Sequence, residues 1–82
     1  MTVLTLYTRP GCHLCDEARE AILGRRGELP PFDLREVNIE ADQDLHARYL
    51  ERIPVLELEG EVIFELHVDL ARLRARLDTV RQ

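Results

Sequence analysis

The spacing of hydrophobic and polar residues divides the first half of the chain into two strands separated by an amphipathic helix. Residues 3–7 are rich in β-branched and aromatic side chains and precede a Pro10-Gly11 turn signal, which predicts a buried strand. Glycines and prolines interrupt the chain before residues 32–39, whose imperfectly alternating apolar side chains predict a second strand. Between these strands, from residue 12 to about 23, apolar side chains recur at helical spacing, at Leu14, Ala18, Ala21 and Ile22.

The second half of the chain adds a short helix, a hairpin and a closing helix. Residues 42–51 begin with Asp42, which can cap a helix, and carry Leu45, Tyr49 and Leu50 on one face. Residues 55–58 and 62–66 predict two strands, and the short Glu59-Gly60 connection between them predicts antiparallel pairing. A helical stripe follows at Leu66, Leu70, Leu73, Leu77 and Val80, and it leaves to solvent the side chains of Arg72, Arg74, Arg76 and Arg81.

The predicted element order β-α-β-α-β-β-α is that of an α/β protein. A right-handed crossover would make the first two strands parallel, and the hairpin would add an antiparallel pair. We therefore expect a four-stranded mixed sheet flanked by three helices. A chain of 82 residues has room for one domain, which we expect to span residues 1–82.

Composition and charge narrow the classes of partner. Hydrophobic residues make up 45% of the chain and charged residues 33%, which is typical of a globular protein. The net charge of −5 argues against binding to a phosphate backbone, so we do not expect a nucleic acid partner. The opening residues lack the features of a signal peptide, and no apolar run approaches the ~20 residues of a membrane span. We therefore expect a cytoplasmic monomer that does not contact a membrane.

The candidate chemistry is carried by two cysteines, Cys12 and Cys15, at the junction of the first strand and the first helix. Residues three apart on a helix have Cβ atoms roughly 5–6 Å apart, close to the separation that a disulfide requires. Cys12 lies at the predicted helix N-terminus, where free N–H groups and the helix dipole favour a thiolate. Arg9 and a protonated His13 would add positive charge nearby. We expect Cys12 to attack a target disulfide and Cys15 to resolve the mixed disulfide.

Other roles for the cysteine pair stay open at this point. No residue is predicted as a metal ligand within one chain, because its three histidines are scattered and there is no second cysteine pair. Two chains could nevertheless pool their cysteines around zinc or an iron–sulfur cluster. Two buried, inert thiols are another alternative, although Gly11 and the helix N-terminus favour exposure of Cys12. The same fold could also act only as a binding module.

The run Tyr-Thr-Arg-Pro-Gly-Cys-His-Leu-Cys at residues 7–15 resembles the active-site segment of glutaredoxin-like proteins of the thioredoxin superfamily. Ile53-Pro54, before a predicted strand, resembles the cis-proline of that superfamily. The resemblance implies a thioredoxin-like fold and a thiol–disulfide oxidoreductase that reduces disulfides. It also implies that the Ile53–Pro54 bond is cis and that the backbone of Ile53 pairs with bound peptide or glutathione. Arg9 stands where many glutaredoxins have a lysine.

The chain departs from the glutaredoxin pattern in two places and from the thioredoxin pattern in one. His13 and Leu14 replace the usual proline and tyrosine between the cysteines. Residues 64–69 lack the glycine pair that in glutaredoxins precedes a helix-capping acidic residue, and Leu6 stands where thioredoxins bury an aspartate. We expect no bound cofactor, with glutathione as a candidate co-substrate. The expected substrate is a disulfide-containing protein or a small thiol, and the expected electron donor is a reductase or glutathione.

Overall fold

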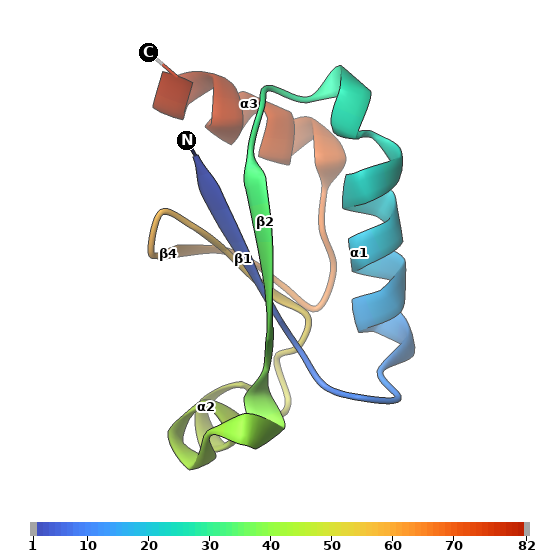
Figure 1. Ribbon diagram of the computed structural model, residues 1–82, viewed down its shortest axis with the longest axis vertical. Coiled ribbons are helices and arrows are strands. Elements are labelled where there is room, and N and C mark those ends of the chain that lie inside the picture. The colour runs from blue at the N-terminus through green and yellow to red at the C-terminus, as the bar shows by residue number, and fades with distance from the viewer. Residues whose placement is uncertain (1, 82) are drawn as a thin grey trace.

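In the computed structural model of the protein, which describes the backbone of residues 2–81 and the side chains of residues 2–80, four strands form one mixed sheet (Figure 1). β2 runs parallel to β1, whereas β3 is antiparallel to β1 and β4 is antiparallel to β3. The predicted mixed sheet is therefore confirmed. In the spatial order β2-β1-β3-β4, the strands are β2 (Asp33–Asn38), β1 (Val3–Thr8), β3 (Val55–Leu58) and β4 (Glu61–Glu65).

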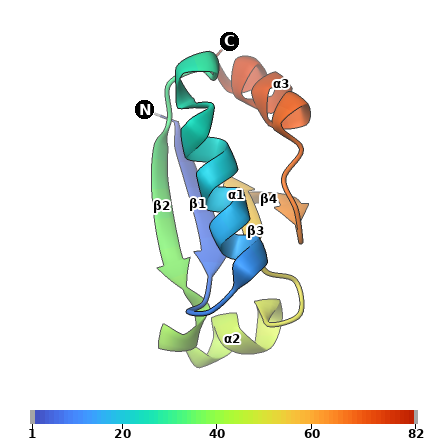
Figure 2. The same cartoon turned by 90° about the vertical axis from the view of Figure 1, so that its right-hand side faces the viewer.

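Three helices flank the sheet, as predicted: α1 (His13–Gly24), α2 (Gln43–Tyr49) and α3 (Leu70–Arg81). α1 and α3 lie on one face, whereas α2 lies at the end of the sheet where β2 finishes (Figures 1 and 2). Asp42 and Asp69 cap α2 and α3, because each side chain accepts two backbone N–H groups from the first helical turn. None of the helices in the described part of the chain is long and apolar enough to cross a bilayer.

The main core lies between the sheet and the two helices that cover its face. Burial alternates along β1, so that Leu4 and Leu6 point into this core while Val3, Thr5 and Tyr7 lie half-buried on the other face. This alternation matches the period of a strand with one covered face. The buried side chains of the main core are Leu4, Leu6, Ala18, Ile22, Phe32, Leu56, Leu58, Leu73 and Leu77.

The predicted hairpin between β3 and β4 is confirmed, and its turn explains how so short a connection reverses the chain. Glu59 and Gly60 have φ values of 50° and 88°. Positive φ at both central residues is the signature of a type I′ turn, whose twist matches that of the flanking strands. Glycine tolerates this conformation without steric cost, which accounts for Gly60.

The spacing of apolar residues predicts Leu66 both at the end of a strand and at the start of the closing helix, and both predictions are wrong. Leu66 neither ends β4, which stops at Glu65, nor begins the closing helix, which starts at Leu70. Its φ is 72°, in the left-handed region that neither a strand nor a helix uses. The helix starts later because Asp69 supplies the cap that fixes its first turn.

Smaller corrections concern the ends and faces of other elements. Ile39 leaves β2 for a 3-10 turn, Ile39–Ala41, in which the Asn38 side chain accepts the N–H of Glu40. Leu50 and Val80, which were placed on apolar helix faces, are exposed. The predicted exposure of Arg81 concerns a side chain outside the described residues.

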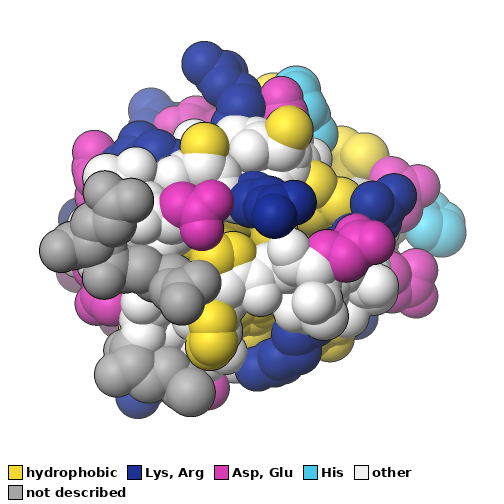
Figure 3. All heavy atoms as spheres, turned by 90° about the horizontal axis from the view of Figure 1, so that it is seen from above, with side chains coloured by type: hydrophobic (Ala, Val, Ile, Leu, Met, Phe, Trp, Pro, Cys, Tyr) yellow, Lys and Arg dark blue, Asp and Glu magenta, His cyan; other side chains and the backbone are white. Residues whose placement is uncertain are grey.

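Acidic and basic side chains are interspersed on the end of the molecule that Figure 3 shows, which is the end where α3 lies. Arg76 of α3, for example, forms an ion pair with Glu61 of β4 at 2.8 Å. Both partners are largely exposed, so this pair contributes little to stability.

Replacing Leu73 with alanine should test the docking of α3 on the sheet. Leu73 is fully buried, so the Leu73→Ala variant should lose about 2–5 kcal/mol of unfolding free energy in urea denaturation. Leu23 of α1 is 42% exposed and provides a matched control. Leu23→Ala should change the unfolding free energy by about 0.5 kcal/mol or less. Equal losses in the two variants would contradict this description of the core.

Candidate active site

β1 leads the chain into a tight turn that ends at Cys12. The N–H of Cys12 donates to the carbonyl oxygen of Arg9 at 3.3 Å, and Gly11 has a φ of 79°. Proline at the second position and a positive-φ glycine at the third are the pattern of a type II turn. Because this φ favours glycine, Gly11 determines how the turn presents Cys12 at the start of α1.

Cys12 is the N-cap residue of α1 rather than its first helical residue. Its backbone is extended, and its Sγ accepts a hydrogen bond from the N–H of Cys15 at 3.1 Å. The sulfur therefore takes the place of the side-chain oxygen in an ordinary N-cap. A thiolate there would gain from this donor and from the positive end of the helix dipole, and both favour the ionised form.

The two cysteines differ in accessibility. They are joined as a disulfide with their Cα atoms 5.2 Å apart, so the pair can close without a large change in the backbone. Cys12 is partly exposed, whereas Cys15 is fully buried. This difference favours Cys12 as the thiol that an incoming disulfide meets and Cys15 as the thiol that acts afterwards from the interior.

The Ile53–Pro54 loop lies against the dithiol. Ile53 and Cys15 belong to one buried cluster, against which Cys12 also packs. The Ile53–Pro54 peptide bond is cis. The N–H of Ile53 donates to the carbonyl oxygen of Tyr49 at 3.0 Å. A bound peptide could therefore pair with the carbonyl oxygen of Ile53, but it could not use the N–H without displacing an existing bond.

Arg9 and His13 are both exposed and lie on either side of Cys12 in sequence. Arg9 lines a polar hollow of about 380 Å³ together with Gly11 and Asn38. Across the side chains that the structure describes, neither Arg9 nor His13 forms a hydrogen bond to the Cys12 sulfur. Their roles in stabilising the thiolate stay predictions, and the N-cap bond is the stabilising contact that the structure shows.

A polar network that the sequence did not reveal ties α1 to β2 beside the active-site turn. Arg19 of α1 donates to both oxygens of Glu36 of β2, at 3.0 and 2.7 Å. Thr8, the last residue of β1, is buried and donates from Oγ1 to the same carboxylate at 3.2 Å. The hydrogen bond from Arg19 lowers the pKa of Glu36 below its usual 4.5. The network thus links the end of β1 to the helix that begins with the cysteines.

A second polar pair lies on the opposite face of the sheet. Tyr7 donates from its hydroxyl to the Glu57 carboxylate at 3.0 Å, and its ring lies 4.9 Å from that of Tyr49. Burial, reinforced by Glu57, raises the pKa of Tyr7 to about 12, so Tyr7 stays a neutral donor. Leu6, at the position of the thioredoxin aspartate, is fully buried in the main core. A leucine side chain at that position offers no proton acceptor.

Two exposed leucines line a groove beside α1. Leu14, between the cysteines, is 49% exposed, and Leu66, after β4, is 48% exposed. Both line one hollow of about 190 Å³, whose floor also includes Ala18 and Ala21 of α1. Sequence reasoning placed both leucines on apolar helix faces and missed this groove. The sequence contained one indication of this groove, because Leu66 lies in the stretch, residues 64–69, where glutaredoxins carry a glycine pair.

The backbone at Leu66 forms a tight and strained turn. The N–H of His67 donates to the carbonyl oxygen of Glu65 at 2.9 Å, which closes a three-residue turn around Leu66. With a φ of 72° at its central residue, this is the rare kind of γ-turn. The left-handed region costs a side-chain-bearing residue roughly 1–2 kcal/mol. The N–H of Leu66 holds the turn in place by donating to the carbonyl oxygens of Arg52 and Pro54, at 3.0 and 2.9 Å.

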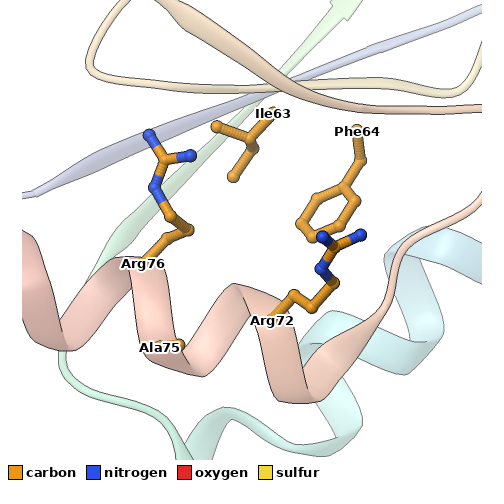
Figure 4. Close-up of a pocket in the computed structure, with 5 residues that line it drawn as sticks. All are labelled: Ile63, Phe64, Arg72, Ala75 and Arg76. Atoms are coloured by element: carbon orange, nitrogen blue, oxygen red, sulfur yellow. The ribbon is translucent and has the colours of Figure 1, made fainter.

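Another hollow, of about 290 Å³, lies between β4 and α3 (Figure 4). Ile63 and Phe64 line it from the strand, and Arg72, Ala75 and Arg76 line it from the helix. None of its lining residues belongs to the active-site turn, to α1 or to the Ile53–Pro54 loop, so it is separate from the candidate active site. Within the described residues, no three His, Cys, Asp or Glu side chains are grouped as metal ligands would be.

Comparison with known proteins gives a family and a fold. The model of the family "Glutaredoxin-like domain (DUF836)" matches residues 3–78. The glutaredoxin-like protein YDR286C homolog from Dictyostelium discoideum is 30% identical over an alignment 84 positions long. The alignment covers 94% of this chain and 76% of the relative. The crystal structure of the structural genomics target XcR50 from X. campestris is 42% identical, with a TM-score of 0.72, and the match covers 93% of this chain and 96% of that one.

A mutant thioredoxin from Halobacterium salinarum is 20% identical, with a TM-score of 0.69, and the match covers 99% of this chain and 75% of that one. At this identity the match shows the fold alone, and it confirms the predicted thioredoxin-like fold. The family match, together with a CxxC pair at disulfide distance, supports a redox role.

Glu36→Gln should test the network beside the active-site turn. At about pH 7 the variant should lose about 1 kcal/mol or less of unfolding free energy, because the ion pair with Arg19 is partly exposed. Since the folded pKa of Glu36 is lowered, this stabilisation is present above the usual value of 4.5 and is lost as the pH falls below it. The gap between wild type and variant in urea denaturation should therefore shrink towards about pH 3. A gap independent of pH would contradict this.

Proposed function

This chain belongs to the glutaredoxin-like domain family, and we propose that it is a thiol–disulfide oxidoreductase that reduces disulfides with its Cys12–Cys15 dithiol. The observation that carries the proposal is the position of the Cys12 sulfur. It caps α1, it is partly exposed, and its partner Cys15 lies buried within bonding reach. A nucleophilic thiol needs a stabilised thiolate and access to its target, and this position supports both.

The reaction proceeds by two thiolate attacks. The Cys12 thiolate attacks one sulfur of the substrate disulfide, which forms a mixed disulfide and releases the other substrate sulfur as a thiolate. The Cys15 thiolate then attacks Sγ of Cys12, which closes the Cys12–Cys15 disulfide and releases the second substrate thiolate. Two electrons pass from the dithiol to the substrate, and the released thiolates take up the two protons that the cysteines gave up.

The residues around the dithiol assist these steps. The N–H of Cys15 holds the Cys12 thiolate, and the positive charges of Arg9 and protonated His13 add to this stabilisation. Pro54 shapes the wall of the substrate groove, and the carbonyl oxygen of Ile53 accepts a hydrogen bond from the substrate backbone. These roles rest on the family resemblance and on the packing of the loop against the cysteines.

The reaction needs a source of electrons, because each turnover leaves the dithiol oxidised. We propose that a reductase enzyme or glutathione returns the pair to the dithiol, so that glutathione would be a co-substrate rather than a bound cofactor. Cycling of this kind is the usual role of a redox-active cysteine pair in a reducing compartment, and the proposed location is the cytoplasm. The proposed substrates are disulfide-containing proteins or small disulfides, met by a monomer.

Trapping the mixed disulfide should separate the roles of the two cysteines. The reduced Cys15→Ser variant, given a disulfide substrate, should accumulate a mixed disulfide through Cys12, because no second thiol can displace the substrate. The matched Cys12→Ser variant should accumulate little, because Cys15 is buried. Intact-mass spectrometry measures both adducts.

The same experiment can reject the proposal. Equal adducts in the two variants would show that the assigned roles are wrong, and no adduct in Cys15→Ser would remove the mechanism. The alternative function is metal binding by cysteines of two chains. Measuring the metal content and the oligomeric mass of protein purified without oxygen tests it. Zinc or iron–sulfur in a dimer would favour cysteines pooled between two chains.

A further inference from the structure

The exposed leucine groove beside the dithiol indicates what the substrate looks like. We infer that Leu14 and Leu66 form a specificity site that receives an apolar side chain next to the cysteine of a protein substrate. The inference rests on the proposed oxidoreductase function and names its substrate class. The preferred substrates are disulfide-bonded protein segments with an apolar residue beside the reactive cysteine.

Leu66 combines a strained backbone, which hydrogen bonds to Arg52 and Pro54 hold in place, with an exposed apolar side chain. Its backbone has a φ of 72°, a conformation that glycine would adopt without strain. Its side chain is 48% exposed, so it does not gain the burial that usually offsets the cost of ordering a leucine. Strained residues of this kind persist only where the surrounding structure holds them, and they cluster at active sites and ligand-binding sites. An apolar ligand group is the partner that suits a leucine side chain.

The position of Leu66 places such a ligand group beside the reaction. Its N–H is bonded to the carbonyl oxygens of Arg52 and Pro54, so the Leu66 turn and the cis-proline loop form one continuous wall. Ile53 of that loop packs in the same buried cluster as Cys15. A substrate chain joined covalently to Cys12 would run along these two segments.

Leu14 supplies the other side of the groove. It lies between the two cysteines in the first turn of α1 and is 49% exposed. On the same helix face, one and two turns on, the small side chains of Ala18 and Ala21 line the groove and leave it hollow. Glu17, His67 and Val68 complete the lining. The groove thus combines two polar residues with two exposed leucines and two alanines, and its apolar part offers room for an apolar side chain.

The covalent intermediate identifies the occupant. Leu14 lies in the first turn of the helix that Cys12 caps, and the Leu66 turn is bonded to the loop that packs with the dithiol. The residues next to a substrate cysteine bonded to Cys12 would therefore meet both leucines. An apolar neighbour would bury surface against both leucines, and this gain is available to the transition state of thiol exchange. Glutathione has only a γ-glutamyl group and a glycine beside its cysteine, so it offers no apolar side chain to the groove.

A competition between two peptide disulfides tests this inference. The peptides are identical except that leucine or serine flanks the cysteine on both sides, and reduced protein receives them in equal amounts. Mass spectrometry measures the consumption of each, and each rate is divided by the rate with dithiothreitol to remove intrinsic reactivity. Wild type should prefer the leucine peptide by about 10-fold or more. Leu14→Gln and Leu66→Gly should each reduce this preference to about 3-fold or less.

The controls separate a loss of binding from a loss of fold. Leu66→Gly removes a side chain from a positive-φ position, so its thermal midpoint should equal or exceed that of wild type. A lower midpoint would mean that the Leu66 side chain supports the fold, and it would overturn the strain argument. Leu23, which is exposed on α1 and does not line the groove, provides a matched variant. Leu23→Gln should keep the wild-type preference.

The outcomes distinguish the inference from the function beneath it. Equal rates for the two peptides in wild type would overturn the inference while leaving the oxidoreductase function in place. An unchanged preference in both groove variants would also overturn it. If the protein reduces neither of the two peptides and also fails to reduce the disulfide of glutathione, the function and the inference are overturned together.

Discussion

The hydrogen bond from the N–H of Cys15 to the sulfur of Cys12 is the contact on which the candidate site depends. It places the sulfur at the one end of α1 where backbone donors are free and the helix dipole is positive. The same geometry keeps the partner cysteine one helical turn away, near enough to close a disulfide. A single N-cap interaction would therefore support both the proposed reactivity of Cys12 and the proposed reversibility of the pair.

The rest of the fold holds this helix end in place from several sides. Gly11 allows the turn that connects β1 to the cap, and the bonds among Thr8, Arg19 and Glu36 tie the strand and the helix to β2. On the other side, Ile53 packs in the buried cluster that includes Cys15. The hydrophobic core of α1 and α3 fixes the helix on the sheet but leaves its N-terminus at the surface. Stability and access are thus provided by different parts of one helix.

The sequence predicted the features that depend on neighbouring residues. Pro10-Gly11 and the spacing of the cysteines indicated the turn and the dithiol, and Glu59-Gly60 indicated the hairpin. The link between Arg19 and Glu36 could not be predicted in this way, because it depends on how a helix crosses a strand 17 residues away. The turn at Leu66 was missed for the opposite reason. Its apolar side chain fits both a strand and a helical stripe, and only the tertiary bonds to Arg52 and Pro54 select a third conformation.

The N-cap position should make Cys12 a stable, accessible thiolate. The most direct test is the rate of alkylation of Cys12 in the fully reduced protein as a function of pH, with the modified residue identified by peptide mass mapping. An ordinary cysteine loses reactivity as the pH falls below about 8.5. We expect Cys12 to keep its full alkylation rate to a pH at least about one unit lower, and we expect Cys15 to stay unmodified in the folded protein. A Cys12 rate that follows an ordinary cysteine, or faster modification of Cys15, would contradict this expectation.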